Sequence, residues 1–329
     1  MMSVDCSFCE GLLPVSTDRE NTEKHEFELY FGNYRLFHVI KRNCLSTVYR
    51  GEHVHLGSSA IVKVLNSWSA TEEHIHQFCA EARLHASLRH TNVIRVLDFG
   101  IRGRTPFIIM DYAARGTLQD YLPTGTPLPL TTIVPYVRQI ANALQYVHNR
   151  KLIHRDVKAQ NILLGPRGEV WLSDFGIAIA AQPWGKQLAL PSVGTAQYVA
   201  PEQIEGHPLT ASDQYALAVQ TYTWLAGRPP FIGSSMQLCK QHLYTTPPRL
   251  SELVPALPAQ VEAVVMRGLE KDPYQRFSCV SDFAHALFFA AYEHDTEPAL
   301  PAFSEWSSSA MLPAAFLDRQ GTSFWSSEA

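Results

Sequence analysis

Long apolar runs are scarce in this sequence. The longest, at 215–227 and 283–292, are interrupted by polar residues and are too short to cross a bilayer. Asp5 and Glu10 lie where a secretion signal would be basic and then apolar. We therefore expect a cytoplasmic protein without a membrane span.

Neither sign of charge is in large excess. The 27 lysines and arginines nearly balance the 31 aspartates and glutamates, so the formal net charge is −4. This balance gives no reason to expect nucleic acid or an anionic membrane surface as a partner.

Cysteines are also few. Six are spread over 329 residues, which is typical of reduced thiols rather than of a disulfide framework. A Cys-x-x-Cys such as that of Cys6 and Cys9 can be half of a zinc ribbon, but no second pair follows at a usable spacing. We prefer a plain tail or a degenerate ribbon for this segment, with zinc binding as the alternative. The 14 histidines, with His-x-His pairs at 53–55 and 74–76, lack a complete ligand set and are expected at the surface.

Apolar residues are plentiful, at 46% of the sequence, enough to build one large two-lobed domain or two small ones. Helical spacing of apolar residues appears at 71–88. A 4-3-4-3 spacing from Ile133 to Val147 predicts a second amphipathic helix, with Pro135 near its first turn. Alternating or continuous β-branched and apolar residues predict strands at 34–40, 47–53, 59–65, 93–99 and 105–112.

A polar set at 152–164 stands between two apolar runs that would hold it against a core. It contains Asp156, Lys158 and Asn161. A carboxylate can orient or deprotonate an attacking hydroxyl, an ammonium can neutralise a transferring phosphate, and an amide can bind Mg²⁺. A second carboxylate, Asp174, is followed by Phe-Gly, where the glycine lets the chain turn. These residue types predict a site for a phosphoryl donor and a metal ion.

Written as motifs, these segments are H-R-D-x-K-x-x-N and D-F-G, and the chain resembles the eukaryotic-like, bacterial-type serine/threonine protein kinase family. Asn161 and Asp174 follow Asp156 by five and eighteen residues, which are the family's spacings. The resemblance implies an α+β fold of two lobes, a small β-rich N-lobe with one main helix and a larger, mostly α-helical C-lobe. We expect an irregular tail with the lone Cys-x-x-Cys at 1–33, the N-lobe at 34–112, the C-lobe at 113–290 and a serine- and aromatic-rich tail at 291–329.

The resemblance also implies catalytic roles. Asp156 would position the acceptor hydroxyl, and Lys158 would offset charge on the γ-phosphate and favours serine/threonine over tyrosine specificity. Asn161 and Asp174 would bind Mg²⁺. Lys63, in the Ala-Ile-Val-Lys strand segment, would contact the α- and β-phosphates of ATP.

The same family pattern predicts the nucleotide pocket. Glu81, on the helix at 71–88, would pair with Lys63. Met110 resembles the gatekeeper, and the backbone of 111–113 the hinge that binds adenine. The residues expected around the nucleotide are Ile40, Val48, Ile61, Lys63, Glu81, Met110, Asp111 and Ala113.

Further positions match the family's structural motifs. Thr195 belongs to a Gly-Thr element whose threonine bonds the catalytic aspartate and lysine. Glu202, in Ala-Pro-Glu, is expected to form a salt bridge with Arg276, and Asp213 to hold the backbone of His-Arg-Asp. The Gly-Thr and Ala-Pro-Glu segments serve peptide docking and argue against a small-molecule kinase.

An arginine before the catalytic aspartate receives an activation-loop phosphate in this family, and Arg155 stands at that place. We predict autophosphorylation of Ser192, with Thr195 as the second candidate.

The chain departs from the family pattern above the nucleotide. Lys41, Asn43 and Ser46 occupy the three positions of the glycine-rich loop, where glycines let backbone N–H groups approach phosphates. Ile61 replaces the alanine that roofs adenine, and His85 takes a slot that is usually apolar.

Two functions are compatible with motif residues that match the family and a loop that departs from it. The first is transfer of the γ-phosphoryl group of Mg²⁺-ATP to serine or threonine hydroxyls of a protein substrate. The alternative is a pseudokinase scaffold that binds ATP weakly or not at all, because its loop lacks glycines. The tail contains Trp306, Phe316, Phe324 and Trp325 among serines, and it is either disordered or a docking segment for the kinase or a partner.

Overall fold

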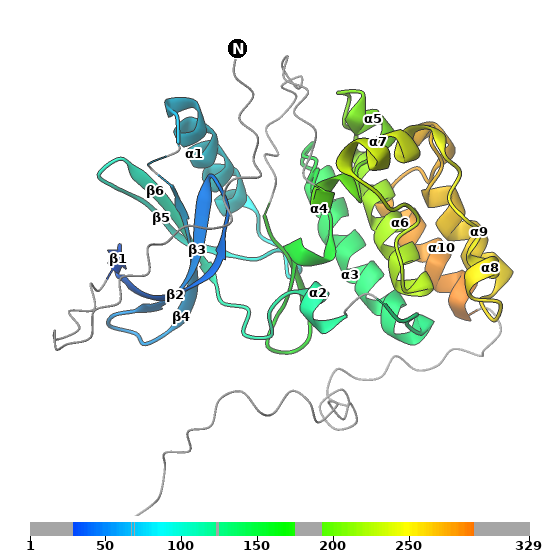
Figure 1. Cartoon of the computed structure of the whole chain (residues 1–329). Coiled ribbons are helices and arrows are strands. Elements are labelled where there is room, and N and C mark those ends of the chain that lie inside the picture. The colour runs from blue at the N-terminus through cyan, green and yellow to red at the C-terminus, as the bar shows by residue number, and fades with distance from the viewer. Residues whose placement is uncertain (1–28, 67, 69, 123–124, 175–192, 293–329) are drawn as a thin grey trace, which may run out of the picture.

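The computed structural model describes residues 29–66, 68, 70–122, 125–174 and 193–292. These residues form a β-rich N-lobe that carries one long helix, and a larger helical C-lobe (Figure 1). The predicted α+β architecture with two lobes is confirmed.

An antiparallel sheet of six strands, in the order β1-β2-β3-β4-β6-β5, forms the N-lobe. All five predicted strands are present, and the largest shift is at β5, which begins at Val96 and not at 93. The strands are β1 (Leu29–Phe31), β2 (Tyr34–Arg42), β3 (Ser46–His53), β4 (Ser59–Leu65), β5 (Val96–Arg102) and β6 (Thr105–Asp111).

Strand β1 lies inside the segment 1–33 that was predicted to be irregular. It pairs with β2 across a tight turn, and Phe31 is buried with its ring centroid 5.1 Å from that of Phe107. The prediction is therefore wrong for residues 29–31. A strand of three residues is too short to show a period in the sequence, and it is stabilised by pairing and by this aromatic contact.

The two faces of the sheet are buried in different ways. One face forms an apolar cluster of its own, which includes Phe107 and Ile109. On the opposite face Ile108 clusters with Phe78 and Ala82 of helix α1 (Glu72–Ser87). Because residues directly opposite in a sheet share a face, this packing holds α1 against the face that carries Lys63, the strand partner of Ile108.

Helix α1 begins after the N-cap residue Thr71. Its hydroxyl accepts a hydrogen bond from the N–H of His74, and the His74 ring accepts one from the N–H of Thr71. This reciprocal arrangement is a capping box with histidine in the place of the usual Glu or Gln. His74, expected only as a surface residue, therefore has a structural role.

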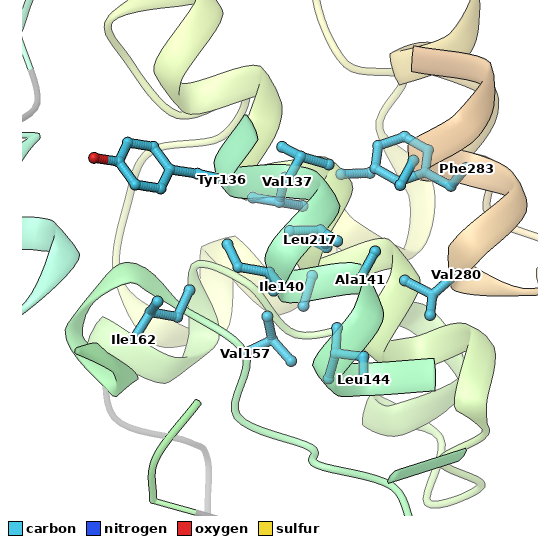
Figure 2. Close-up of a cluster of buried hydrophobic side chains, with 14 of the residues drawn as sticks. Tyr136, Val137, Ile140, Ala141, Leu144, Val157, Ile162, Leu217, Val280 and Phe283 are labelled. Atoms are coloured by element: carbon cyan, nitrogen blue, oxygen red, sulfur yellow. The ribbon is translucent and has the colours of Figure 1, made fainter. Parts of the chain in front are cut away.

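Helix α3 (Leu130–His148) is the centre of the C-lobe and contacts α6 and α10. Figure 2 shows its residues Val137, Ile140 and Leu144 among side chains of those helices. Val157, between Asp156 and Lys158, and Ile162, directly after Asn161, enter the same cluster and are 1% and 0% exposed. These two side chains anchor the polar loop to the core.

The remaining C-lobe elements surround α3 or lead away from it (Figure 1). They are α2 (Leu118–Tyr121), the 3₁₀ turn η2 (Ala159–Asn161), the hairpin of β7 (Ile162–Leu164) and β8 (Val170–Leu172), α4 (Val193–Ala196), α5 (Pro201–Ile204), α6 (Thr210–Ala226), α7 (Ser235–Tyr244), α8 (Leu250–Leu253), α9 (Ala259–Gly268), η3 (Pro273–Gln275) and α10 (Val280–Tyr292).

Two helix ends differ from the sequence prediction. Helix α3 starts at Leu130, so Pro135 is its sixth residue and not part of its first turn. Leu130, three residues before Ile133 and partly buried against the core, continues the apolar spacing by one more turn. Helix α10 continues to Tyr292, two residues into the segment assigned to the tail. No helix within the described ranges is long and apolar enough to span a membrane.

Candidate active site

A cavity of about 470 Å³ opens between the N-lobe sheet and the C-lobe. Its size lies in the range of small-molecule binding sites. Ile61, although larger than alanine, leaves this space open. Six of the predicted nucleotide contacts line it: Ile40, Val48, Ile61, Lys63, Met110 and Ala113.

Two predicted nucleotide contacts lie outside this cavity. The side chain of Asp111 forms an ion pair with Arg95 at 3.1 Å, and Tyr112 and Ala113 line the cavity beside it. Glu81 borders a neighbouring cavity of about 350 Å³ beside α1. The side chain of Asp111 thus turns to Arg95, and the expected contact of the hinge backbone with adenine stays a prediction.

Lys63 lies between two carboxylates. Its Nζ is 3.2 Å from Glu81 Oε1 and 3.1 Å from Asp174 Oδ1. Burial alone would lower the pKa of Lys63, but Asp174 and Glu81 outweigh it and raise that pKa above its ordinary value. Lys63 holds the pKa of Asp174 at about 2 against the effect of burial, and burial raises the pKa of Glu81. At neutral pH, Lys63 is therefore a cation and Asp174 an anion.

Asp156 is held by hydrogen bonds from two neighbours. Lys158 Nζ donates to Asp156 Oδ1 at 2.7 Å and to Thr195 Oγ1 at 3.1 Å. Asn161 Nδ2 donates to Asp156 Oδ2 at 2.7 Å and to its carbonyl oxygen at 2.9 Å. Because the amide nitrogen of Asn161 faces Asp156, its Oδ1 is the atom suited to a metal ion.

The donor set fits Mg²⁺ that shares its ligands with phosphates. Ser173 donates its N–H and its hydroxyl to the Asn161 carbonyl oxygen, both at 2.9 Å, which ties Asn161 to the residue before Asp174. Mg²⁺ takes oxygen ligands, commonly one or two from the protein and others from substrate phosphates and water. Within the described ranges no cluster of three or more His, Cys, Asp or Glu could hold a metal ion.

Two residues of the site have a strained backbone conformation, and Asp213 holds one of them in place. Arg155 and Asp174 have φ angles of 68° and 48°, a left-handed conformation that costs on the order of 1 kcal/mol or more for such residues. Asp213 accepts the N–H groups of His154 and Arg155, each at 2.8 Å. Burial opposes ionisation of Asp213, but hydrogen bonds, foremost from His148, hold its pKa below the ordinary value. A buried anion thus holds the strained turn.

A second buried ion pair joins Glu202 to Arg276. Nη1 and Nη2 of Arg276 each lie 2.8 Å from a carboxylate oxygen of Glu202, and Ser212 Oγ donates to Oε1 at 2.7 Å. Arg276 is 3% exposed and Glu202 6%. The arrangement links α5 to the chain between α9 and α10.

His85 was singled out only as a departure from the family pattern. It is buried, and its Nε2 donates to the carbonyl oxygen of Ile94 at 2.9 Å. Burial lowers its pKa to about 4. His85 therefore occupies this apolar slot as a neutral ring with a hydrogen bond, which residue type alone did not indicate.

Some predicted features lie outside the described residues. They are the Cys6–Cys9 motif, Ser192 and the aromatic tail beyond Tyr292. Thr195, the second candidate for phosphorylation, lies in α4 with its hydroxyl accepting from Lys158.

Comparison with known proteins identifies the class that the fold and this geometry indicate. The family described as protein kinase domain matches residues 40–288. The chain belongs to the protein kinase family.

Among its relatives, serine/threonine-protein kinase Pkn1 of Myxococcus xanthus is 37% identical over 272 residues, which are 80% of this chain and 39% of that protein. PrkC of Bacillus subtilis is 31% identical over 254 residues, which are 76% of this chain and 39% of that protein. PknA of Mycobacterium tuberculosis is 36% identical over 279 residues, which are 82% of this chain and 64% of that protein.

The chain thus spans 39% to 64% of the length of these relatives. The resemblance to bacterial serine/threonine kinases is confirmed, and the comparisons do not support the pseudokinase alternative.

Proposed function

We propose that the chain transfers the γ-phosphoryl group of Mg²⁺-ATP to a serine or threonine hydroxyl of a protein substrate. The observation that carries this proposal is the single set of contacts in which Lys158 bridges Asp156 and Thr195, while Asn161 holds the other carboxylate oxygen of Asp156. A carboxylate held in this way can orient a hydroxyl, and a lysine beside it can offset phosphate charge.

The residue roles follow from these positions. Lys63 orients the phosphates, and Asp156 orients the acceptor hydroxyl and takes its proton as the new O–P bond forms. The bond from the γ-phosphorus to the bridging oxygen breaks, and ADP leaves. Asn161 and Asp174 are the ligands for Mg²⁺, which neutralises phosphate charge when bound.

A radiolabel transfer assay with casein and Mg²⁺-ATP tests the proposal. Wild type is expected to transfer label, whereas Asp156→Ala loses at least 100-fold, on the order expected for loss of an acid–base group. Asp98→Asn, at an exposed carboxylate on β5, is the matched control and keeps wild-type activity. Equal label from wild type and Asp156→Ala would contradict the proposal.

The acceptor and the metal are tested in the same assay. Phosphoamino-acid analysis is expected to show phosphoserine and phosphothreonine without phosphotyrosine. Chelation by EDTA should abolish transfer and added Mg²⁺ should restore it, because Asn161 and Asp174 offer hard oxygen ligands.

We propose in addition that Ser192 is autophosphorylated, with Thr195 as the second candidate, because Arg155 lies before Asp156 where it would pair with a phosphate. Mass spectrometry after incubation with ATP tests this, and active protein unmodified at both residues would contradict it. The aromatic tail is proposed to dock on the kinase or on a partner protein.

A cytoplasmic location is also proposed. Its support is the proposed use of ATP and the four described cysteines, Cys44, Cys79, Cys239 and Cys279, which are free thiols. Fractionation of cells that express the protein tests this location.

A further inference from the structure

The loop between β2 and β3 lies at the edge of the nucleotide cavity: Lys41 and Val48 line that cavity, whereas residues 43–46 line the neighbouring one. The tip of the loop is closed on itself. Asn43 Oδ1 accepts the N–H groups of Leu45 at 3.0 Å and Ser46 at 2.6 Å. The N–H of Asn43 donates to the carbonyl oxygen of Ser46 at 2.9 Å. Three backbone donors at the tip are thus satisfied within the loop, and a phosphate would have to break these bonds to use them.

Asn66, the residue after β4, also holds the closed tip by hydrogen bonds. Asn66 Nδ2 donates to the carbonyl oxygens of Asn43 at 2.9 Å and Cys44 at 3.3 Å. Its Oδ1 accepts from the buried hydroxyl of Thr47 at 2.8 Å. Opening the loop would therefore disturb two side-chain amides, so we expect the tip to keep this shape when nucleotide binds.

The strand register directs Lys41, near the end of β2, toward the cavity. Lys41 lies opposite Val48, and Val48 lies opposite Lys63. Directly opposed residues share a face, so the three side chains form one row across β2, β3 and β4. A β-bulge between Val39 and Lys41 sets this register.

Lys41 is part of the wall of the catalytic cavity. It lines the same cavity as Lys63 and Asp174. Neighbouring strands are about 4.8 Å apart, so two strand spacings separate the lysines by roughly 10 Å, a span suited to a chain of phosphates. The cavity thus presents a second cation on the side of the closed loop.

We propose that Lys41 binds the triphosphate of ATP and replaces the backbone N–H donors that Asn43 occupies. This inference rests on the proposed function, because it assigns a residue to ATP binding. It explains how a loop without glycines at 41, 43 and 46 can still hold the phosphates: the contact comes from a side-chain ammonium and not from the backbone.

The test measures binding of two ligands to the full chain by isothermal titration calorimetry, Mg²⁺-ATP and adenosine. Lys41→Met is expected to weaken ATP binding roughly tenfold or more, the range of a lost charge-assisted hydrogen bond. Adenosine binding should change less than about twofold, because the apolar walls stay intact. In kinetics, the KM for ATP should rise by a similar factor while kcat stays within about threefold.

Two variants complete the design. Arg42→Gln removes the neighbouring positive charge, which does not line the cavity, and should bind ATP like wild type. Lys41→Arg should retain most of the affinity. If Lys41→Met binds ATP as wild type does, or loses adenosine binding in parallel, the inference is overturned. If wild type itself binds no ATP, the proposed function fails instead.

Discussion

At the scale of single residues, His85 is a buried polar side chain in a slot that is otherwise apolar. The ring is 3% exposed and is kept neutral by burial, with its N–H donated to Ile94. A neutral imidazole with one hydrogen bond is tolerated in a core, whereas an imidazolium there is costly. The residue therefore makes folding sensitive to acid.

His85→Leu is expected to reduce the dependence of the unfolding free energy on pH. The unfolded chain binds a proton at His85 near pH 6.5, whereas the folded chain does so only near pH 4. The free energy of unfolding therefore falls as the pH drops from 6.5 to 4, by on the order of 3 kcal/mol. The variant removes that contribution, while His242, whose pKa burial also lowers to about 4, keeps its own.

Urea denaturation at several pH values between 4 and 7 measures this effect. His55→Gln, at an exposed histidine, is the control and should leave the pH dependence unchanged. An identical slope for wild type and His85→Leu would show that His85 is not the residue responsible.

At the scale of elements, the turn from β2 to β3 and the start of α1 are each closed by a side chain that returns to the backbone. Asn43 closes the turn, and Thr71 with His74 closes the helix. In both places the side chain satisfies backbone N–H groups locally. In the turn, the N–H groups that donate to Asn43 are therefore not available to a ligand.

Asn43→Gly is expected to lower the KM for ATP by a factor of about two to ten, because the N–H groups of Leu45 and Ser46 become available to phosphates. Steady-state kinetics with ATP as the varied substrate measure it. Asn43→Asp keeps an acceptor at this position and adds a negative charge, so it should raise the KM. An unchanged or higher KM for Asn43→Gly would mean that loop order matters more than the freed donors.

Thr71→Ala is expected to destabilise the protein by about 1 kcal/mol, the usual value of an N-cap hydroxyl. Hydrogen exchange in the first turn of α1 should accelerate, and denaturation should report the same loss. Thr71→Ser keeps the hydroxyl and should remain near wild type. Equal stability for the alanine and serine variants would refute a role for this cap.

At the scale of the whole molecule, partly or fully buried ion pairs connect segments that are distant in sequence. Lys63 connects the sheet to α1 and to Asp174, whereas Arg276 connects the end of the C-lobe to Glu202. Removing one partner of such a pair leaves a buried charge without compensation. Exposed pairs lack this penalty because water replaces the lost partner.

Arg276→Met is expected to lower the free energy of unfolding by about 3–5 kcal/mol, because it leaves the Glu202 carboxylate buried without its cation. Arg95→Met breaks the more exposed pair with Asp111 and should cost no more than about 1 kcal/mol. Chemical denaturation compares the two variants. Similar losses from both would contradict the assigned burial effect.

The sequence predicted the elements with strong periods and the motif residues, because both are local patterns. The spacing from Asp156 to Asn161 and Asp174 indicated the site before any contact was known. It did not indicate the short strand β1, the His74 cap or the turn of Asp111 toward Arg95. Each of these depends on a partner that local residue patterns do not specify.

What the sequence by itself determined is the set of chemical groups and the apolar runs that hold them. Lys63, Asp156, Asn161 and Asp174 are charged or amide residues beside segments that must be buried, and this alone indicated phosphoryl transfer. Tertiary structure decided which groups face the cavity. The bulge in β2 and the bonds of Asn43 turn Lys41 inward and close the loop, because strand register and hydrogen-bond satisfaction are settled only when the strands meet.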